Sequence, residues 1–452
     1  MTTTAGPASS TPLRFRAGYA VGILGAALPS LLVGAWFLKY CASGEGGFVL
    51  GAERAGALLF AGRIFDAVID PLVGTASDRA RTRFGRRLPF IAAGAPLLAL
   101  GVAGLYTPPP AGLAPVPWLA LALGALWLGY TLAIAPYLAL LPEVFPDARE
   151  RFSVATLMGV ADLAGNVLLL AAAGFAVRGI GYRALAAVVA VAAVAALLPT
   201  LVLVRERGVP PPAAGARASA RAAIAAEVRS WLAILRGPAF LRYVVARTGL
   251  LASVSAIVAV TPFLAEVVLG RGEGTAGLLQ AWVVVLAGLA FPLLGRFAAR
   301  VGPAAVFRAG LLAFGLLLPA LLTLGPSPAP LAHAAVLYAL AAFPVACAFV
   351  LPRALMADII EEDGRRTGAR REGLYFGLEG LLTKAGTGLG PLIVGASFAL
   401  LGDAGAGGGG SGGDGAAGAA AAPSIAAVLG VGPLAAVPAL LGWWAFRRYP
   451  LR

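Results

Sequence analysis

The sequence is poor in charged residues, cysteine and histidine. Charged residues make up 12% of the 452 residues, against about a quarter in soluble globular domains, while 60% are hydrophobic. The lone His333 excludes a multi-histidine metal site, and Cys41 and Cys347 provide neither a disulfide framework nor a metal cluster. We therefore expect a polytopic membrane protein without a cofactor.

Lysine is scarce as well. Of the 35 lysine and arginine residues, only Lys39 and Lys384 are lysines. Because arginine supplies the positive charge elsewhere, a lysine deep in an apolar segment suggests a specific role. The net charge of +14 fits cytoplasmic loops facing anionic lipid better than a nucleic-acid partner. The expected partners are a lipid bilayer and a small-molecule substrate, with the chain acting as a monomer.

Twelve apolar segments are long enough to cross a bilayer, which takes about 20 apolar residues. Arginine-rich loops alternate with loops of little charge, so the positive-inside rule predicts a multi-pass protein of the cell inner (plasma) membrane with both termini in the cytoplasm. The predicted fold is all-α, with twelve transmembrane helices in two six-helix halves. The predicted parts are an N-terminal tail (1–16), an N-terminal half (17–204), a cytoplasmic central loop (205–242), a C-terminal half (243–447) with a Gly/Ala-rich external loop (404–422), and a C-terminal tail (448–452).

Two carboxylates interrupt the apolar segment that we predict to span the membrane over residues 54–77. Asp66 and Asp70 are four residues apart and so share one face of a helix. Each charge at mid-membrane costs roughly 2.5–3.5 kcal/mol on insertion scales, which packing alone does not explain. We interpret the pair as a binding site for a coupling cation, either Na⁺ or H⁺.

Lys384 is predicted to lie at the same depth as Asp66. Each is eleven residues from the inner end of its predicted span, or about 16 Å at 1.5 Å rise per residue. If the two spans are neighbours, the ammonium group of Lys384 can compensate the aspartates when no ion is bound. A structural ion pair that only locks the helices is the alternative.

Other polar residues in the predicted spans are weaker candidates. Thr131 offers a hydroxyl ligand for an ion, although a lone membrane threonine more often bonds to its own helix. The candidates for a substrate cavity are Arg63, Asp162, Asn166, Glu379 and Thr383.

The segment Gly62–Arg87 resembles the second helix and following loop of the glycoside–pentoside–hexuronide:cation symporters, the melibiose-permease branch of the major facilitator superfamily. Met356–Tyr375 looks like the loop between helices 10 and 11 of that family, and Lys384 follows at the position of its helix 11 lysine. The resemblance implies a major facilitator fold, cation binding by Asp66, Asp70 and Thr131, charge pairing by Lys384, and a cytoplasmic gate that includes Asp78, Arg79, Gly85 and Arg86.

The chain departs from that family where the family binds sugar. Ile69 occupies the position of an asparagine ion ligand, and the predicted first span carries no acid. Ile134 and Leu138 stand where sugar-binding members have a helix 4 acid and an aromatic side chain. The resemblance therefore implies that the ion site is largely kept and the sugar site replaced.

These observations predict a secondary active transporter that couples a cation to symport of a small organic solute, such as a glycoside or related sugar. The alternative is transport of lysophospholipid or another amphipathic solute, which related eukaryotic members carry. An intramembrane prenyltransferase would need a second aspartate-rich motif at the level of Asp66 and Asp70, and a sensor on a transporter fold is a further reading. We do not expect an enzyme.

Overall fold

The computed structural model describes residues 11–206, 231–368, 371–402 and 423–451, and these residues are almost entirely helical. Long apolar stretches fold as helices in a bilayer because every backbone N–H and C=O group must be satisfied within the segment. The first half contains α1 (Leu13–Val21), α2 (Leu24–Ser43), α3 (Ala52–Arg79), α4 (Leu88–Leu105), α5 (Pro115–Val144) and α6 (Ala148–Leu203). The second half contains α8 (Pro238–Phe263), η1 (Leu264–Val268), α9 (Glu273–Val301), α10 (Pro303–Leu317), η2 (Leu318–Leu324), α11 (Pro330–Thr367), α12 (Glu372–Leu401) and α13 (Ile425–Phe446).

The described helices account for twelve membrane spans. Ten helical segments of the described chain are long and apolar enough to span a bilayer. One of them, α6, runs for 56 residues and contains a break at Gly181, whose φ of 79° and ψ of 165° are not helical, so α6 supplies two spans. The charged helix α3, with 28 residues, is not among the ten and supplies the remaining span.

Some predicted boundaries fall inside helices. Helix α1 begins at Leu13, within the segment predicted as the N-terminal tail, and α8 begins at Pro238, within the predicted central loop. Most of that loop (207–230) and the whole predicted external loop (404–422) lie outside the described residues.

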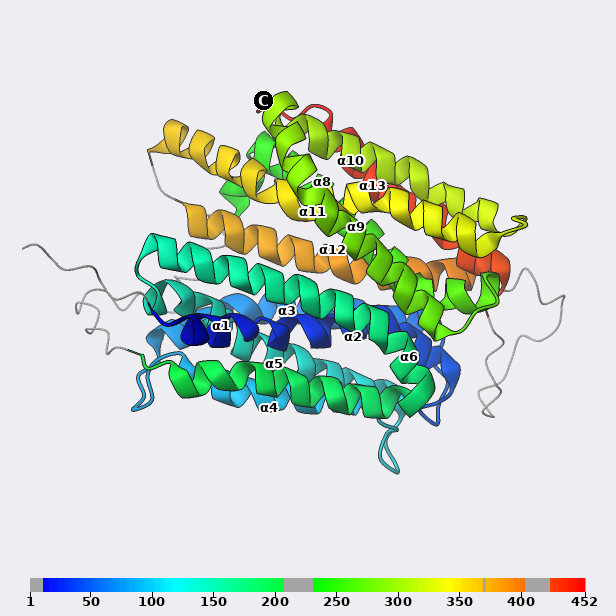
Figure 1. Ribbon diagram of the computed structural model, residues 1–452, viewed down its shortest axis with the longest axis horizontal. Coiled ribbons are helices and arrows are strands. Elements are labelled where there is room, and N and C mark those ends of the chain that lie inside the picture. Colours follow the sequence, from blue (N-terminus) through cyan, green and yellow to red (C-terminus); the bar gives the residue numbers. More distant parts are fainter. Residues whose placement is uncertain (1–10, 207–230, 369–370, 403–422, 452) are drawn as a thin grey trace, which may run out of the picture.

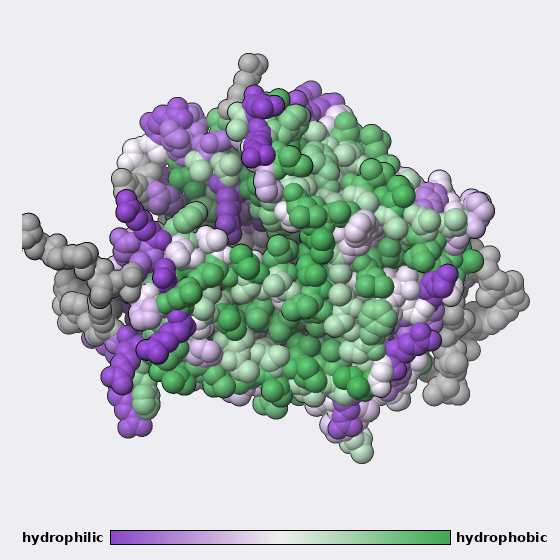
Figure 2. All heavy atoms as spheres, in the orientation of Figure 1, coloured by the Kyte–Doolittle hydropathy of each residue, from purple (hydrophilic) through white to green (hydrophobic). Residues whose placement is uncertain are grey.

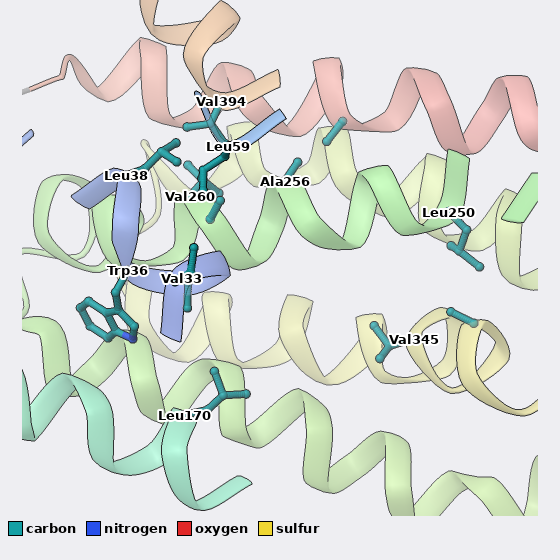
Figure 3. Packing of buried hydrophobic residues seen from close by; sticks show 14 of the residues in the cluster. Val33, Trp36, Leu38, Leu59, Leu170, Leu250, Ala256, Val260, Val345 and Val394 are labelled. Atoms are coloured by element: carbon teal, nitrogen blue, oxygen red, sulfur yellow. The ribbon is translucent and has the colours of Figure 1, made fainter. Parts of the chain in front are cut away.

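The two halves lie side by side, α1–α6 in the lower part of Figure 1 and α8–α13 in the upper part. They pack through three helix pairs: α3 along α12, α2 against α8, and α6 against α9. Hydrophobic side chains cover the middle of the bundle and hydrophilic ones gather at its two ends (Figure 2), as a bilayer requires. The buried core draws on both halves, with Val33, Leu59, Val260 and Val394 in one cluster (Figure 3).

The halves approach closely at one end of the bundle only. At the end away from the arginine-rich loop 80–87, a Cβ added to Gly395 of α12 would lie 2.7 Å from Cα of Glu53 in α3. At the arginine-rich end, an added Cβ at Gly74 of α3 or Gly377 of α12 would meet no atom of the described chain within 4 Å, apart from its own helix backbone. The helices α3 and α12 therefore diverge toward the arginine-rich end.

This divergence predicts opposite effects of one substitution at two sites in α12. Gly395→Ala forces backbone against backbone and should destabilise the protein by about 1–3 kcal/mol. Gly377→Ala enters open space and should be neutral or stabilise by up to about 1 kcal/mol, since alanine is the better helix former. Thermal unfolding of the two purified variants checks this, and equal melting temperatures would contradict the close approach at Gly395.

Candidate functional site

Three of the predicted ion ligands converge between α3 and α5. The hydroxyl of Thr131 in α5 lies 2.9 Å from Oδ1 of Asp66 and 3.0 Å from Oδ1 of Asp70. Asp66 and Thr131 are fully buried, whereas the side chain of Asp70 is 36% exposed. The four-residue spacing places both carboxylates on the face of α3 that meets Thr131. This arrangement offers a set of oxygen atoms of the kind that hard cations prefer.

Lys384 of α12 completes the cluster from the other half of the protein. Its Nζ lies 3.0 Å from Oδ1 of Asp66 and 2.5 Å from Oδ2 of Asp70. The ammonium group also lies 5.7 Å from the ring centroid of Tyr130. The spans that contain Asp66 and Lys384 are therefore neighbours, as the charge compensation predicted from their equal depth requires. We call Asp66, Asp70, Thr131 and Lys384 the polar cluster.

Arg63 adds a second positive charge beside the polar cluster. Its Nη1 lies 3.7 Å from Oδ2 of Asp66, and its guanidinium carbon lies 3.9 Å from the ring centroid of Trp127. That Oδ2 atom is buried and accepts no hydrogen bond from a described residue. Two cationic side chains thus balance two carboxylates, so an added cation would leave an excess positive charge unless Lys384 or Arg63 moves away.

Glu379 and Thr383 lie apart from the polar cluster. The carboxylate of Glu379 pairs with Nε of Arg247 at 2.8 Å and accepts a hydrogen bond from the hydroxyl of Tyr243. Arg247 also donates to the carbonyl oxygen of Ala348 at 2.8 Å. The hydroxyl of Thr383 bonds within α12. These contacts tie α8, α11 and α12 together within the second half, and the sequence alone did not reveal the partner of Arg247.

A cavity of about 650 Å³ lies between α2 and α6 of the first half and α8, α9, α10, η2 and α11 of the second. Of the predicted cavity residues, Asp162 and Asn166 line it, and Arg63, Glu379 and Thr383 do not. The polar cluster does not line it either. Most of the wall is apolar, and its other polar side chains are Thr261, Gln280, Tyr338 and Arg353. The polar cluster and the cavity are thus separated in space.

The predicted gate residues form a charged network within the first half. Oδ1 of Asp78 lies 2.9 Å from Nη2 of Arg87. Glu143 accepts from Arg86 at 2.5 Å and lies 3.0 Å from Nη1 of Arg87. The side chain of Arg79 is not among those that the structure describes.

Glu206, which no sequence motif indicated, caps the start of α4. Its carboxylate accepts hydrogen bonds from the backbone N–H groups of Arg86, Arg87 and Leu88, the last two at 2.6 Å. Gly85 has a φ of 105°, and a Cβ there would lie 2.6 Å from Cδ of Glu206. Glycine is thus required at this turn for both its backbone angle and the space it leaves.

Lys39, the other lysine, joins the two halves at the opposite end of the bundle. It forms an ion pair with Glu266 of η1, and its Nζ lies 5.2 Å from the ring centroid of Phe263. Lys39 is 9% exposed, so the pair is shielded on the lysine side. Both lysines of the chain therefore bridge the two halves, Lys384 at the polar cluster and Lys39 near the end where the halves meet.

Solved structures define the class of fold. The chain superposes on the nucleoside transporter NupG with a TM-score of 0.61 at 15% identity, over 96% of this chain and 98% of that one. It superposes on the peptide transporter POT in complex with sulfate with a TM-score of 0.69 at 14% identity, over 96% and 95%. These similarities show that the chain shares the fold of these two proteins.

Residues 18–452 match the family described as MFS/sugar transport protein, and the chain belongs to that family. The family is one of transporters rather than of enzymes. It is 30% identical over 208 residues to the uncharacterized symporter sll1374 of Synechocystis sp., which is 43% of this chain and 37% of that protein. It is 35% identical over 108 residues to the “Putative glycoside/cation symporter YagG” of Escherichia coli, or 24% of each chain. These alignments cover well under two thirds of the relatives' lengths.

The cap at α4 yields a prediction about stability. Glu206→Ala leaves three backbone N–H groups at the start of α4 without their acceptor and should destabilise the first half by about 1–2 kcal/mol. Glu361→Ala is the matched control, because its side chain is 69% exposed and makes only a surface ion pair with Arg365. Thermal unfolding compares the two, and equal melting temperatures would show that Glu206 does not act as a cap.

Proposed function

We propose that this protein is a cation-coupled symporter that moves a small organic solute by alternating access, with Asp66, Asp70 and Thr131 as the cation ligands. The observation that carries the proposal is the contact of Lys384 with both aspartates across the two halves. Charged groups in membrane helices face one another or a transport pathway, and here they do so at the boundary between two bodies that can move.

The charge balance suggests how the cation would act. Without an added ion, Lys384 and Arg63 neutralise the two aspartates. A Na⁺ ion or a proton between Asp66 and Asp70 would replace the ammonium group as the neutralising charge. Lys384 would then be free to leave α3, which loosens one of the three contacts between the halves. Ion binding is thereby linked to the relative position of the halves.

In this proposal, the conformation described here is one end state of the transport cycle. The halves meet at the end that carries the Lys39–Glu266 pair, and α3 and α12 diverge at the arginine-rich end. The positive-inside rule assigns the arginine-rich end to the cytoplasm, so we propose that this is the inward-facing state and that both termini are cytoplasmic. The gate network of Asp78, Arg86 and Arg87 lies at the open end. The bilayer is the plasma membrane and the functional unit a monomer in this proposal.

The cavity favours an amphipathic solute over a simple sugar. A glycoside is the substrate that the name of the YagG protein describes. However, most of the residues lining the cavity here are apolar. A sugar needs polar partners for its hydroxyl groups, since each buried polar group without a hydrogen bond is costly. We therefore keep both solute classes and place the amphipathic one first.

The cation site can be tested before any solute is known. An ion that binds only the folded protein raises its stability by RT ln(1 + [L]/Kd), or about 2.7 kcal/mol at a hundred times Kd. Na⁺ should raise the melting temperature of the wild type, and Asp66→Asn and Asp70→Asn should lose this response. If acid pH replaces Na⁺ in stabilising the wild type, H⁺ is the coupling ion.

The matched control for this experiment is Asp162→Asn, which removes a membrane carboxylate outside the polar cluster and should keep the response. If neither Na⁺ nor pH distinguishes the aspartate variants from the wild type, the cation site is refuted.

Lys384→Met separates coupling from a purely structural ion pair. Without the ammonium group, the buried carboxylate of Asp66 and the partly exposed one of Asp70 lose a partner, so in sodium-free buffer the variant should be less stable by about 3–5 kcal/mol. If Na⁺ and Lys384 compete for the aspartates, added Na⁺ should restore much of this loss and bind more tightly than to the wild type. Lys39→Met removes the other bridging lysine and should not change the apparent Na⁺ affinity. A Lys384→Met protein that is destabilised but insensitive to Na⁺ would favour the structural ion pair.

A further inference from the structure

Asp162 is a carboxylate in the membrane domain without a cationic partner in the described protein. It lies on the face of α6 that lines the cavity with Gly159, Leu163, Asn166 and Leu170, and it forms no ion pair with a described residue. Ionisable groups inside a membrane domain are costly and pair with a partner or a ligand. Asp162 therefore calls for a cation that comes from outside the chain.

Arg353 is positively charged and lines the same cavity, but it does not form an ion pair with Asp162. It lines the cavity from α11 but is exposed. It is also the last lining residue of α11, sixteen residues or about 24 Å beyond Leu337 at 1.5 Å rise per residue. Arg353 forms no ion pair with a described residue, so it leaves Asp162 without a cationic partner.

A second unpartnered hydrogen-bond acceptor lies in the wall of the cavity. Gln280 of α9 lines the same cavity and is only 4% exposed. Its Nε2 donates to the carbonyl oxygen of Val258 at 2.8 Å, which fixes the amide, while its Oε1 is buried and has no partner in the described chain. The nearby hydroxyls of Thr261 and Tyr338 bond to each other at 2.7 Å. The cavity wall thus presents the negative charge of Asp162, which has the amide of Asn166 as a neutral partner, whereas Oε1 of Gln280 is not accessible from the cavity.

The rest of the cavity wall is apolar and therefore fits an apolar part of a ligand. The helices α8, α9, α11 and the α10–η2 segment each turn one face of aliphatic and aromatic side chains inward, with Phe291, Phe314 and Phe349 among them. The volume of about 650 Å³ lies within the range of cavities that bind drug-sized molecules, about 300–1,000 Å³. Contact with such walls stabilises a compact hydrophobic group, and aromatic faces also attract cations.

We infer that this cavity binds an organic cation, in which an ammonium group pairs with Asp162 while a compact apolar body fills the pocket. The inference rests on the proposed function in taking this cavity as the solute pathway. It goes further by specifying the charge of the solute. A neutral sugar would leave Asp162 uncompensated, and an organic anion would be repelled by it.

Three probes of one shape test the inference: 1-aminoadamantane, which is protonated at neutral pH, 1-adamantanol and 1-adamantanecarboxylate. Binding to the full-length protein in nanodiscs is measured by isothermal titration calorimetry in sodium buffer. We expect the ammonium probe to bind about tenfold or more tightly than the alcohol, and the carboxylate most weakly, because the ion pair forms in an apolar surrounding.

The variants assign the preference to Asp162. Asp162→Asn should remove the advantage of the ammonium probe over the alcohol, while Asp162→Glu, which keeps the charge, should retain it. Glu361→Gln removes an exposed carboxylate of α11 and should bind all three probes as the wild type does.

Either of two results would overturn the inference: a wild type that does not prefer the ammonium probe, or an Asp162→Asn protein that still does. The sodium-dependent melting temperature, measured on the same preparations, separates this from the proposed function. A sodium response without ammonium preference leaves the symporter proposal intact and refutes the organic cation. Ammonium binding that depends on Asp162 without any sodium response supports the solute class and refutes sodium coupling.

Discussion

The contact of Lys384 with Asp66 and Asp70 is the interaction on which the arrangement of this protein depends. The ammonium group of Lys384, with the guanidinium group of Arg63 beside it, balances two carboxylates that are costly in a membrane, and Lys384 does so across the boundary between two helical halves. A compensation of this kind within one half would serve only to hold helices together. Across the boundary, any ion that takes the place of the ammonium group also changes how firmly α3 and α12 are joined. The electrostatics of the polar cluster and the motion of the halves are thus parts of one equilibrium.

The two halves differ in how their charged residues are used. In the first half, Glu206, Glu143 and Asp78 hold the loop 80–87 against the helix ends, so this end is rigid within its own half. In the second half, the contact between Glu379 and Arg247 joins helices around a core. The two lysines instead join one half to the other. Two bodies that meet along three helix pairs and are joined by two lysine ion pairs are suited to a two-state motion, because breaking an ion pair does not disturb the packing inside either body.

The cavity and the polar cluster occupy different places in the bundle. The cavity lies between helices α2 and α6 and the second half, and the polar cluster lies between α3, α5 and α12. An ion and a solute therefore need not touch one another to be linked. In the proposed mechanism each would contact residues of both halves or lie at their boundary, so each could bias the same movement. This separation also allows the solute pocket to diverge from that of sugar transporters while the polar cluster is kept.

The sequence by itself determined the helical membrane fold, the depth of Asp66 and Lys384, and the candidate cation ligands, because hydrophobic length, arginine placement and helical spacing are local properties of the chain. The sequence could not determine which helices touch. Packing between distant segments decides the partner of Arg247 and the cap that Glu206 forms about 120 residues from the helix that it caps. It also decides that Arg63 and Glu379 do not line the cavity. The tertiary structure also decided the apolar character of the cavity, since a wall made by one face of each of several helices is not contiguous in the sequence. Local spacing fixes the face on which a residue lies, and only packing decides what that face meets.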